Sequence, residues 1–216
     1  MRTVGLIGGM SWRSTVSYYT HLNETVQARA GGHANAPSVL VTVDFARLEP
    51  LQRAGDWDGA SALVVDAARQ LQAAGAECVV ICANTMHVAA DAVRKAVPDL
   101  PLLHIGDATA DALAADGVDR AVLLGTRYTM ELPFLRDHLA ARGIVTEVPD
   151  AEARDELQRI IYEELVHGRA SDASRGYVAG LGGPAILGCT ELSLLGLPGY
   201  DTTRLHAEMA AAFALG

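Results

Sequence analysis

Residues 4–15, VGLIGGMSWRST, and residues 121–131, AVLLGTRYTME, share one pattern: an apolar run, a glycine, a short turn with a hydroxyl residue and then the start of a helical segment. A short apolar run that ends at glycine is typical of a buried strand, and apolar residues at i, i+3 and i+4 are typical of an amphipathic helix. Because this strand–turn–helix unit occurs twice, the sequence predicts two related halves.

The rest of the chain alternates in the same way between short β-branched runs and longer alanine-rich segments. We expect strands at residues 3–8, 38–45, 77–83, 100–105, 120–125, 143–148 and 184–189. Expected helices include residues 14–29, 59–74, 89–97 and 151–166. The alternation predicts an α/β fold of two pseudo-symmetric domains with mainly parallel sheets. We place the first domain at 1–100, completed by a C-terminal helix at 203–216, and the second at 101–202.

Composition excludes several classes of partner. The 216 residues are half apolar, which is enough to bury a full core, and the formal net charge is −9 with a pI near 5.2. Such a chain offers no basic field for nucleic acid or an acidic membrane surface, and we expect neither as a partner. The apolar run at the N-terminus is too short for a signal peptide and no segment approaches the length of a membrane span, so we expect a soluble cytoplasmic protein.

The chain has only three cysteines, and two of them occupy matching places. Cys82 ends the apolar run in ECVVICANTMHVAAD (77–91), and Cys189 ends the run in GGPAILGCTELSLLG (182–196). Both lie where a strand is expected to meet a helix, at the carboxyl edge of a sheet, where α/β proteins bind ligands and where thiol pKa values are lowered. Cys78, inside its expected strand, fits a small buried hydrophobe instead.

Two thiols set across one cleft by the pseudo-symmetry suit proton transfer at a carbon from both faces. One thiolate removes the proton from an amino-acid α-carbon, and a thiol on the opposite side delivers another. The charge that develops on the substrate carboxylate requires nearby donors. Asn84 and Thr85 after the first cysteine, and Thr190 after the second, are donors of this kind.

Other site chemistries are less well supported. Gly5, Gly8 and Gly9 lack dinucleotide-fingerprint spacing, and the spacing of Cys78, Cys82 and His87 matches no common zinc site. We therefore expect no metal and no cofactor.

Several polar residues near the two cysteines keep two interpretations. His87 and Glu191 could orient a cysteine or cap a helix. The hydroxyl residues of the two turns, Ser11 and Thr126, could cap a helix or contact a ligand.

The segments LIGGMSWRSTVSYY (6–19), CANTMHVAADAV (82–93), LLGTRYTMELPFL (123–135) and LGCTELSLLGLPGYDTTRLHAE (187–208) together resemble the PLP-independent aspartate/glutamate racemase family, in particular its broad amino-acid racemase branch. The resemblance implies two α/β domains with the active site in the cleft between them, usually in a homodimer. It also implies two catalytic cysteines, Cys82 and Cys189. In the same pattern Asn84, Thr85 and Thr190 would hold the α-carboxylate, and Met10, Ser11 and Thr126 would line the substrate pocket.

The chain departs from this family at two points that bear on the site. The helix before the second cysteine is cut to about residues 173–179, and Val166 and His167 stand where aspartate racemases usually place a lysine. Arg47 or Arg53 could supply the missing charge.

Our first hypothesis is therefore a cofactor-independent racemase of aspartate, glutamate or a related polar amino acid. The alternatives are a dicarboxylic-acid decarboxylase or isomerase of the same superfamily, which needs only one of the two thiols, and a non-catalytic amino-acid-binding protein.

Overall fold

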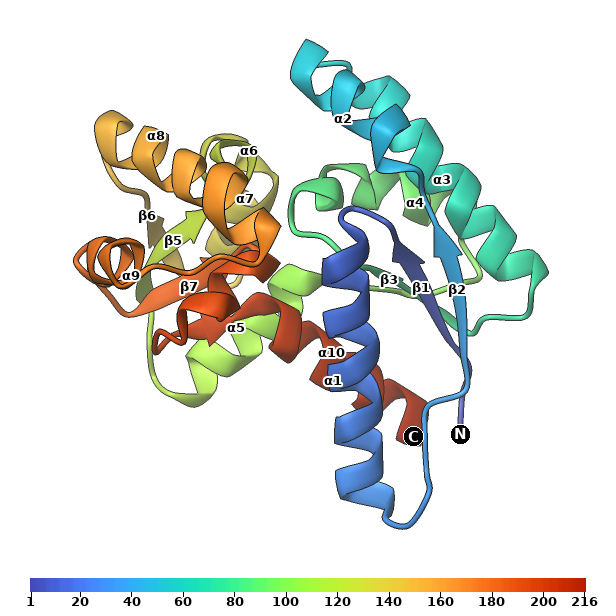
Figure 1. Cartoon of the computed structure of the whole chain (residues 1–216). Helices are drawn as coiled ribbons and strands as arrows, with labels where there is room; N and C mark the ends of the chain where they lie inside the picture. The colour runs from blue at the N-terminus through green and yellow to red at the C-terminus, as the bar shows by residue number, and fades with distance from the viewer. The chain divides into compact units, whose positions relative to one another are not determined.

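The computed structural model describes residues 1–216, which form two compact units. Unit 1 contains Met1–His104 together with His206–Gly216, and unit 2 contains Ile105–Leu205. The chain thus passes from unit 1 to unit 2 after His104 and returns after Leu205 (Figure 1). No helix of the structure is long and apolar enough to cross a membrane.

Unit 1 is built on a four-stranded parallel sheet with the strand order β2-β1-β3-β4. Its elements are β1 (Val4–Gly8), α1 (Trp12–Ala30), β2 (Ser38–Thr42), α2 (Phe45–Ala54), α3 (Trp57–Ala73), β3 (Cys78–Ile81), η1 (Thr85–Ala89), α4 (Ala90–Ala96), β4 (Leu102–Leu103) and most of α10 (Thr202–Leu215).

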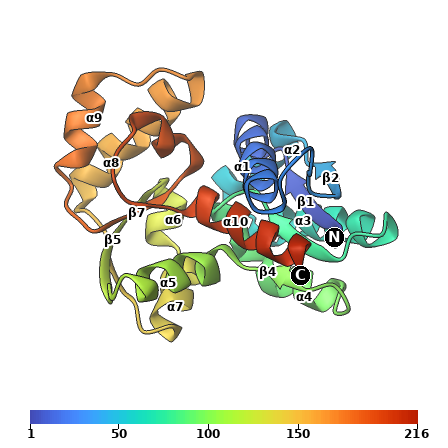
Figure 2. The ribbon, with the colours of Figure 1, turned by 90° about the horizontal axis from the view of Figure 1, so that it is seen from below.

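Helices cover both faces of this sheet. One core cluster joins the sheet to α2, α3, η1 and α4. The other joins it to α1 and α10, through Tyr18, Leu22 and Val26 of α1 and a row of buried alanines on α10. Figure 2 shows α10 running beside α1 in this unit. The two central strands, β1 and β3, are fully buried because helices pack on both faces of the sheet.

Unit 2 repeats this plan with the strand order β6-β5-β7-β8. Its elements are α5 (Ile105–Ala115), β5 (Arg120–Gly125), α6 (Arg127–Glu131), α7 (Pro133–Ala141), β6 (Val145–Glu147), α8 (Ala151–Arg159), η2 (Ile160–Glu164), η3 (Leu165–His167), α9 (Asp172–Ala179), β7 (Ala185–Gly188), η4 (Thr190–Leu195) and β8 (Tyr200–Asp201). One face packs on α5 and α7, and the other on α6, α8, η2, η3, α9 and η4.

The predicted α/β fold class is confirmed, with two parallel sheets of equivalent topology. All seven expected strands are present. The sequence did not predict β8, because two residues between Gly199 and a helix carry no periodicity of their own. The helix expected at 151–166 changes its hydrogen-bonding pattern along its length. It is an α-helix to Arg159, a π-helix over Ile160–Glu164 and a 3-10 turn to His167.

Candidate active site

Cys82 is the first residue beyond β3, and the sheet fixes its position. Its backbone N–H donates to the carbonyl oxygen of Ile7 in β1 at 2.9 Å, and its side chain is fully buried. The thiol donates to the carbonyl oxygen of Val80 at 3.9 Å, a long contact even for sulfur. Burial raises the pKa of the Cys82 thiol far above its ordinary value, because a thiolate would lose its hydration there. In this structure Cys82 is therefore a neutral thiol at pH 7.

Asn84 and Thr85 follow Cys82 at the start of η1. Asn84 is buried and Thr85 is half-buried. Met86, one position further, points into the core on the α3 side of the sheet. The amide and the hydroxyl thus lie directly beside the carboxyl end of β3, and they are the groups of this segment that can donate to an anion.

His87, in the same 3-10 turn, is held by its own backbone and by other histidines. Its Nδ1 bonds the carbonyl oxygen of Ala83 at 2.8 Å. Its ring centroid lies 4.6 Å from that of His104 and 5.5 Å from that of His206. Burial and these two neighbours hold the pKa of His87 well below its ordinary value, so the ring is neutral at pH 7. His87 thus makes the local backbone bond of a core histidine.

Met10 and Ser11 form the turn between β1 and α1. Ser11 is the N-cap of α1, and its Oγ accepts from the N–H of Ser14 at 3.4 Å. The turn depends on Gly9, which has φ +92° and whose position leaves no room for a Cβ, since one would lie 2.0 Å from the carbonyl oxygen of Val43. Met10 is half-buried against the core. Helix capping by Ser11 is thus present in the structure, and it leaves the residue at the carboxyl end of β1.

Cys189 is the first residue beyond β7, the position that Cys82 has beyond β3. It is buried, and its Sγ–H donates to Oε2 of Glu191 at 3.1 Å. Burial raises the pKa of the Cys189 thiol well above its ordinary value, and the negative charge and hydrogen bond of Glu191 raise it further. The backbone N–H groups of Glu191 and Leu192 lower the thiol pKa, but these effects are smaller. Cys189 is therefore a neutral thiol at neutral pH.

Thr126 and Thr190 lie at the same edge of the second sheet. Thr126 caps α6, with its Oγ1 accepting from the N–H of Thr129 at 3.4 Å. Thr190 is buried and begins η4. Strands β5 and β7 approach closely just before these residues, because Gly125 pairs with Gly188 and a Cβ on Gly125 would lie 2.9 Å from the carbonyl oxygen of Gly188.

The structure thus brings the sequence-predicted residues together in two groups, one at the carboxyl edge of each sheet. The group in unit 1 contains Met10, Ser11, Cys82, Asn84, Thr85 and His87. The group in unit 2 contains Thr126, Cys189, Thr190 and Glu191. Because the two sheets have the same strand order, each cysteine follows the strand next to the first strand of its unit.

Of the two arginines considered for the substrate side chain, Arg53 is already paired. Its guanidinium binds both carboxylate oxygens of Glu49 on the exposed surface of α2, at 2.5 and 2.7 Å. Arg47 lies in the first turn of the same helix, just after the carboxyl end of β2, and is exposed. Arg47 is therefore at the sheet edge that also carries Cys82.

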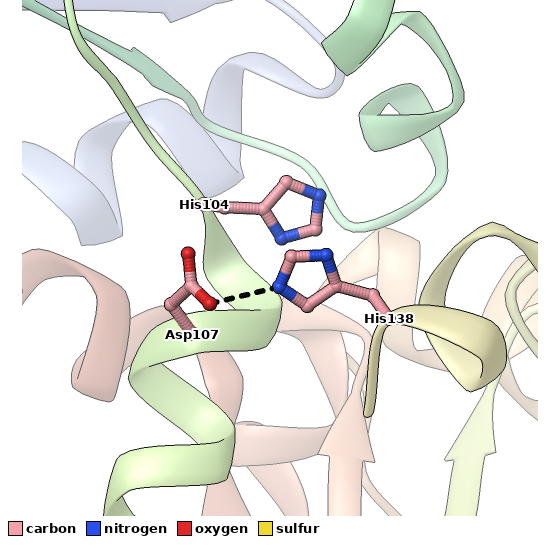
Figure 3. Close-up of side chains that lie close together, drawn as sticks. All are labelled: His104, Asp107 and His138. Carbon is pink, nitrogen blue, oxygen red and sulfur yellow. Dashed lines mark hydrogen bonds and ion pairs between the residues drawn. The ribbon is translucent and has the colours of Figure 1, made fainter. Parts of the chain in front are cut away.

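Histidines without a visible partner in the sequence acquire one in the structure. His138 of α7 binds Oδ1 of Asp107 in α5 through Nε2 at 2.9 Å (Figure 3). Arg142 binds the same carboxylate oxygen at 2.6 Å and also pairs with Asp111. These bonds tie α7 to α5 within unit 2. The paired residues are 31 positions apart in the sequence, so a local motif could not predict the contact.

Thr203 is a polar residue at this sheet edge that the sequence analysis did not single out. It lies in the first turn of α10, just after β8, is 1% exposed, and its hydroxyl makes no hydrogen bond. A buried hydroxyl without a partner can be recognised only in the folded structure. The sequence indicates only that two hydroxyl residues follow the last strand.

The fold and the site define a class of protein: an α/β protein with a free, buried thiol at the carboxyl edge of each of two parallel sheets. The chain belongs to the Asp/Glu/Hydantoin racemase family, whose model matches residues 7–210. This membership confirms the resemblance seen in the sequence, and it indicates a racemase-type function.

Solved structures agree with the family. The chain is 45% identical to a proposed Asp/Glu racemase from Yersinia pestis, with all of both chains covered and a TM-score of 0.92. It is 30% identical to an aspartate racemase homologue from Pyrococcus horikoshii, again over all of both chains, with a TM-score of 0.85. The aspartate racemase of Picrophilus torridus, at 19% identity, shares the fold, with a TM-score of 0.75 over 99% of this chain and 94% of that one.

Proposed function

We propose that this protein racemises an acidic amino acid, aspartate or glutamate, without a cofactor, and that Cys82 and Cys189 are its two acid–base groups. The observation that carries the proposal is the equivalent placement of the two free cysteines, each as the first residue beyond the matching strand of its sheet. Membership of the racemase family supports it.

In this mechanism the two thiols act on opposite faces of one α-carbon. The thiolate of one takes the α-proton, and the thiol of the other returns a proton to the flattened intermediate, so the stereocentre inverts. The reverse reaction exchanges the two roles. The negative charge that spreads into the α-carboxylate is stabilised by hydrogen-bond donors, for which Asn84, Thr85 and Thr190 are our candidates.

The mechanism requires one thiolate, although burial raises the pKa of both thiols. Each pKa unit above the working pH costs about 1.4 kcal/mol of ionisation free energy. We infer that the substrate supplies part of the compensation. Its α-ammonium group is a positive charge, and such a charge within about 4–6 Å lowers the pKa of an acid by roughly 1–3 units.

The remaining substrate contacts are assigned by position. Met10, Ser11 and Thr126 line the pocket, at the edges of β1 and β5. Arg47, at the carboxyl end of β2, is our candidate for the side-chain carboxylate, because Arg53 is paired with Glu49. The resemblance to homodimeric racemases favours a homodimer. The three free thiols favour a protein that works in the reducing cytoplasm.

The decisive experiment incubates the protein with L- and D-aspartate and L- and D-glutamate in D₂O, without pyridoxal phosphate. Loss of the α-proton signal by NMR, with deuterium appearing in the opposite enantiomer, is the expected result. Binding without exchange would instead identify an amino-acid-binding protein. Loss of a carboxyl group from a malonate-type acid, with no exchange on amino acids, would identify a decarboxylase.

Replacement of either thiol tests the roles. Cys82→Ser and Cys189→Ser should each lower racemisation at least a hundredfold, because a serine hydroxyl is too weak an acid to exchange protons at neutral pH. Cys78→Ser is the matched control, since Cys78 is buried inside β3 and should leave turnover near the wild-type value. Full racemisation in either of the first two variants would remove that cysteine from the mechanism.

A further inference from the structure

Two adjacent threonines at the start of α10 differ in one respect. The Thr202 hydroxyl donates to the carbonyl oxygen of Leu187 in β7 at 2.9 Å. The Thr203 hydroxyl is just as buried, but it has no hydrogen-bond partner. Leaving a buried hydroxyl unpaired is unfavourable, and native proteins do so rarely, so the group is expected to gain a partner in some state of the protein.

Thr203 lies just beyond the carboxyl end of β8, the strand next to β7, which Cys189 follows. Leu187 of β7 pairs with Asp201 of β8, and Cys189 and Thr203 each follow their paired residue by two positions. The bond from Thr202 to Leu187 shows that the two chain segments remain side by side beyond the last paired residue. Both residues belong to unit 2, so this placement depends on one sheet alone.

In this structure the hydrogen-bond partner of the Cys189 thiol is Glu191. The thiol proton is directed to Glu191, and a neutral thiol sulfur is only a weak acceptor. A thiolate is a much stronger acceptor because it carries a full negative charge. The Glu191 carboxylate disfavours that thiolate, and therefore a donor is needed on another side of the sulfur.

We propose that the Thr203 hydroxyl is this donor: it turns to Sγ when Cys189 loses its proton and stabilises the thiolate. Thr203 is thus a supporting residue that acts through Cys189. Its effect on turnover rests on the proposed racemase function, whereas its effect on the thiol does not.

The test measures the Cys189 thiol directly. In a protein with Cys78→Ala and Cys82→Ala, Cys189 is the only thiol, and its rate of alkylation by iodoacetamide follows the thiolate fraction as pH is varied. Adding Thr203→Val, which keeps the shape but removes the hydroxyl, should raise the apparent pKa of Cys189 by about one pH unit, and slow alkylation about tenfold below it. Thr203→Ser should restore the parent value.

Thr202→Val is the matched control. It removes a bonded hydroxyl, so it should lower the thermal unfolding midpoint and leave the apparent pKa of Cys189 unchanged. An unchanged pKa in Thr203→Val overturns the proposal, and it is the result expected if a buried water satisfies the hydroxyl. An equal rise in the pKa in Thr202→Val would also overturn it, because the effect would then be a general one of the α10 start.

A second measurement links Thr203 to catalysis. With Cys82→Ser, α-proton exchange in D₂O reports on Cys189 alone, and Thr203→Val should slow it about tenfold. With Cys189→Ser, the same substitution should change nothing; slowing there would contradict a role through Cys189. If the wild-type protein exchanges no α-proton, the racemase proposal fails, and the alkylation result still decides the role of Thr203.

Discussion

Cys82 and Cys189 occupy equivalent places but have different neighbours. The thiol of Cys82 meets only a distant carbonyl oxygen, whereas that of Cys189 donates to a carboxylate at 3.1 Å. Pseudo-symmetric strands therefore do not give two identical acids. The difference comes from one residue, Glu191, which follows Cys189 by two positions.

The Glu191 carboxylate can be tested by removing its charge. Glu191→Gln keeps a hydrogen-bond acceptor beside Sγ but removes the negative charge that raises the thiol pKa, so the pKa of Cys189 should fall and its thiolate should form at lower pH. Alkylation of Cys189 as a single thiol, followed against pH, measures this shift. Glu152→Gln, an exposed change on α8, serves as the control and should have no effect. A raised or unchanged pKa in Glu191→Gln would contradict the described electrostatics.

At this scale the sequence identified the two cysteines but not their surroundings. Their position at the ends of apolar runs is a local pattern, and in the structure each cysteine directly follows a strand. The bond between Cys189 and Glu191 depends on side-chain geometry, and the sequence left Glu191 open between a helix cap and a partner of the thiol. The unpaired hydroxyl of Thr203 depends on packing around α10, which no pattern in the chain encodes.

Four elements of unit 1 meet in a buried cluster of aromatic rings. His206 of α10 donates from Nε2 to the carbonyl oxygen of Leu103 at 2.9 Å, so its Nδ1 accepts from the hydroxyl of Tyr18 in α1 at 3.0 Å. His87 of η1 lies against the rings of His206 and His104, the residue after β4. The cluster holds α10 on this unit.

The cluster makes stability depend on pH. The folded-state pKa of His87 lies well below 6.5, so between these two pKa values the unfolded chain binds a proton that the folded chain does not. Stability should therefore fall as pH decreases through about 6.5, by up to about 1.4 kcal/mol per pH unit. Thermal unfolding between pH 5 and 8 measures the slope.

The matched pair for this measurement is His87→Asn and His33→Asn. The first removes the buried ring and should flatten the pH slope, while the second alters an exposed histidine and should leave the slope as it is. Equal slopes in the wild type and His87→Asn would show that other groups cause the acid sensitivity.

Long, periodic elements were predictable and short ones were not. The alternation of apolar residues located all the strands of four or more residues, and α1 and α3 were recognised within a few positions. The two-residue β8 and the π-helical turn over Ile160–Glu164 were missed, because their geometry is set by the neighbouring elements that pack on them and not by periodicity. The cap residues Ser11 and Thr126 match the sequence interpretation that allowed helix capping.

At the scale of the whole molecule, the chain gives the helix after the last strand of each unit to the other unit. Helix α5 follows β4 but belongs to unit 2. Helix α10 follows β8, but most of it belongs to unit 1. Alanines at 207, 210, 211 and 214 complete the core beside α1. The sequence analysis placed a C-terminal helix at 203–216 in the first domain.

A pair of alanines on α10 tests this contribution. Ala210 is fully buried against the first sheet, and Ala212 is exposed. Ala210→Asp should destabilise the protein by about 3 kcal/mol or more, because it buries an unpaired charge, whereas Ala212→Asp should be nearly neutral. Hydrogen exchange should show the lost protection of Ala210→Asp in residues 1–104. Loss confined to residues 105–205 would contradict the assignment of α10 to unit 1.

The exchanged helices also set an order for folding on the ribosome. Unit 1 cannot close its core until residues 206–216 have been made, although its sheet is synthesised first. Every part of unit 2 has been made by residue 205. Domains usually fold from the N-terminus as they emerge. We therefore expect the part of the first sheet that α10 covers to stay exposed in the nascent chain until residues 206–216 have been made.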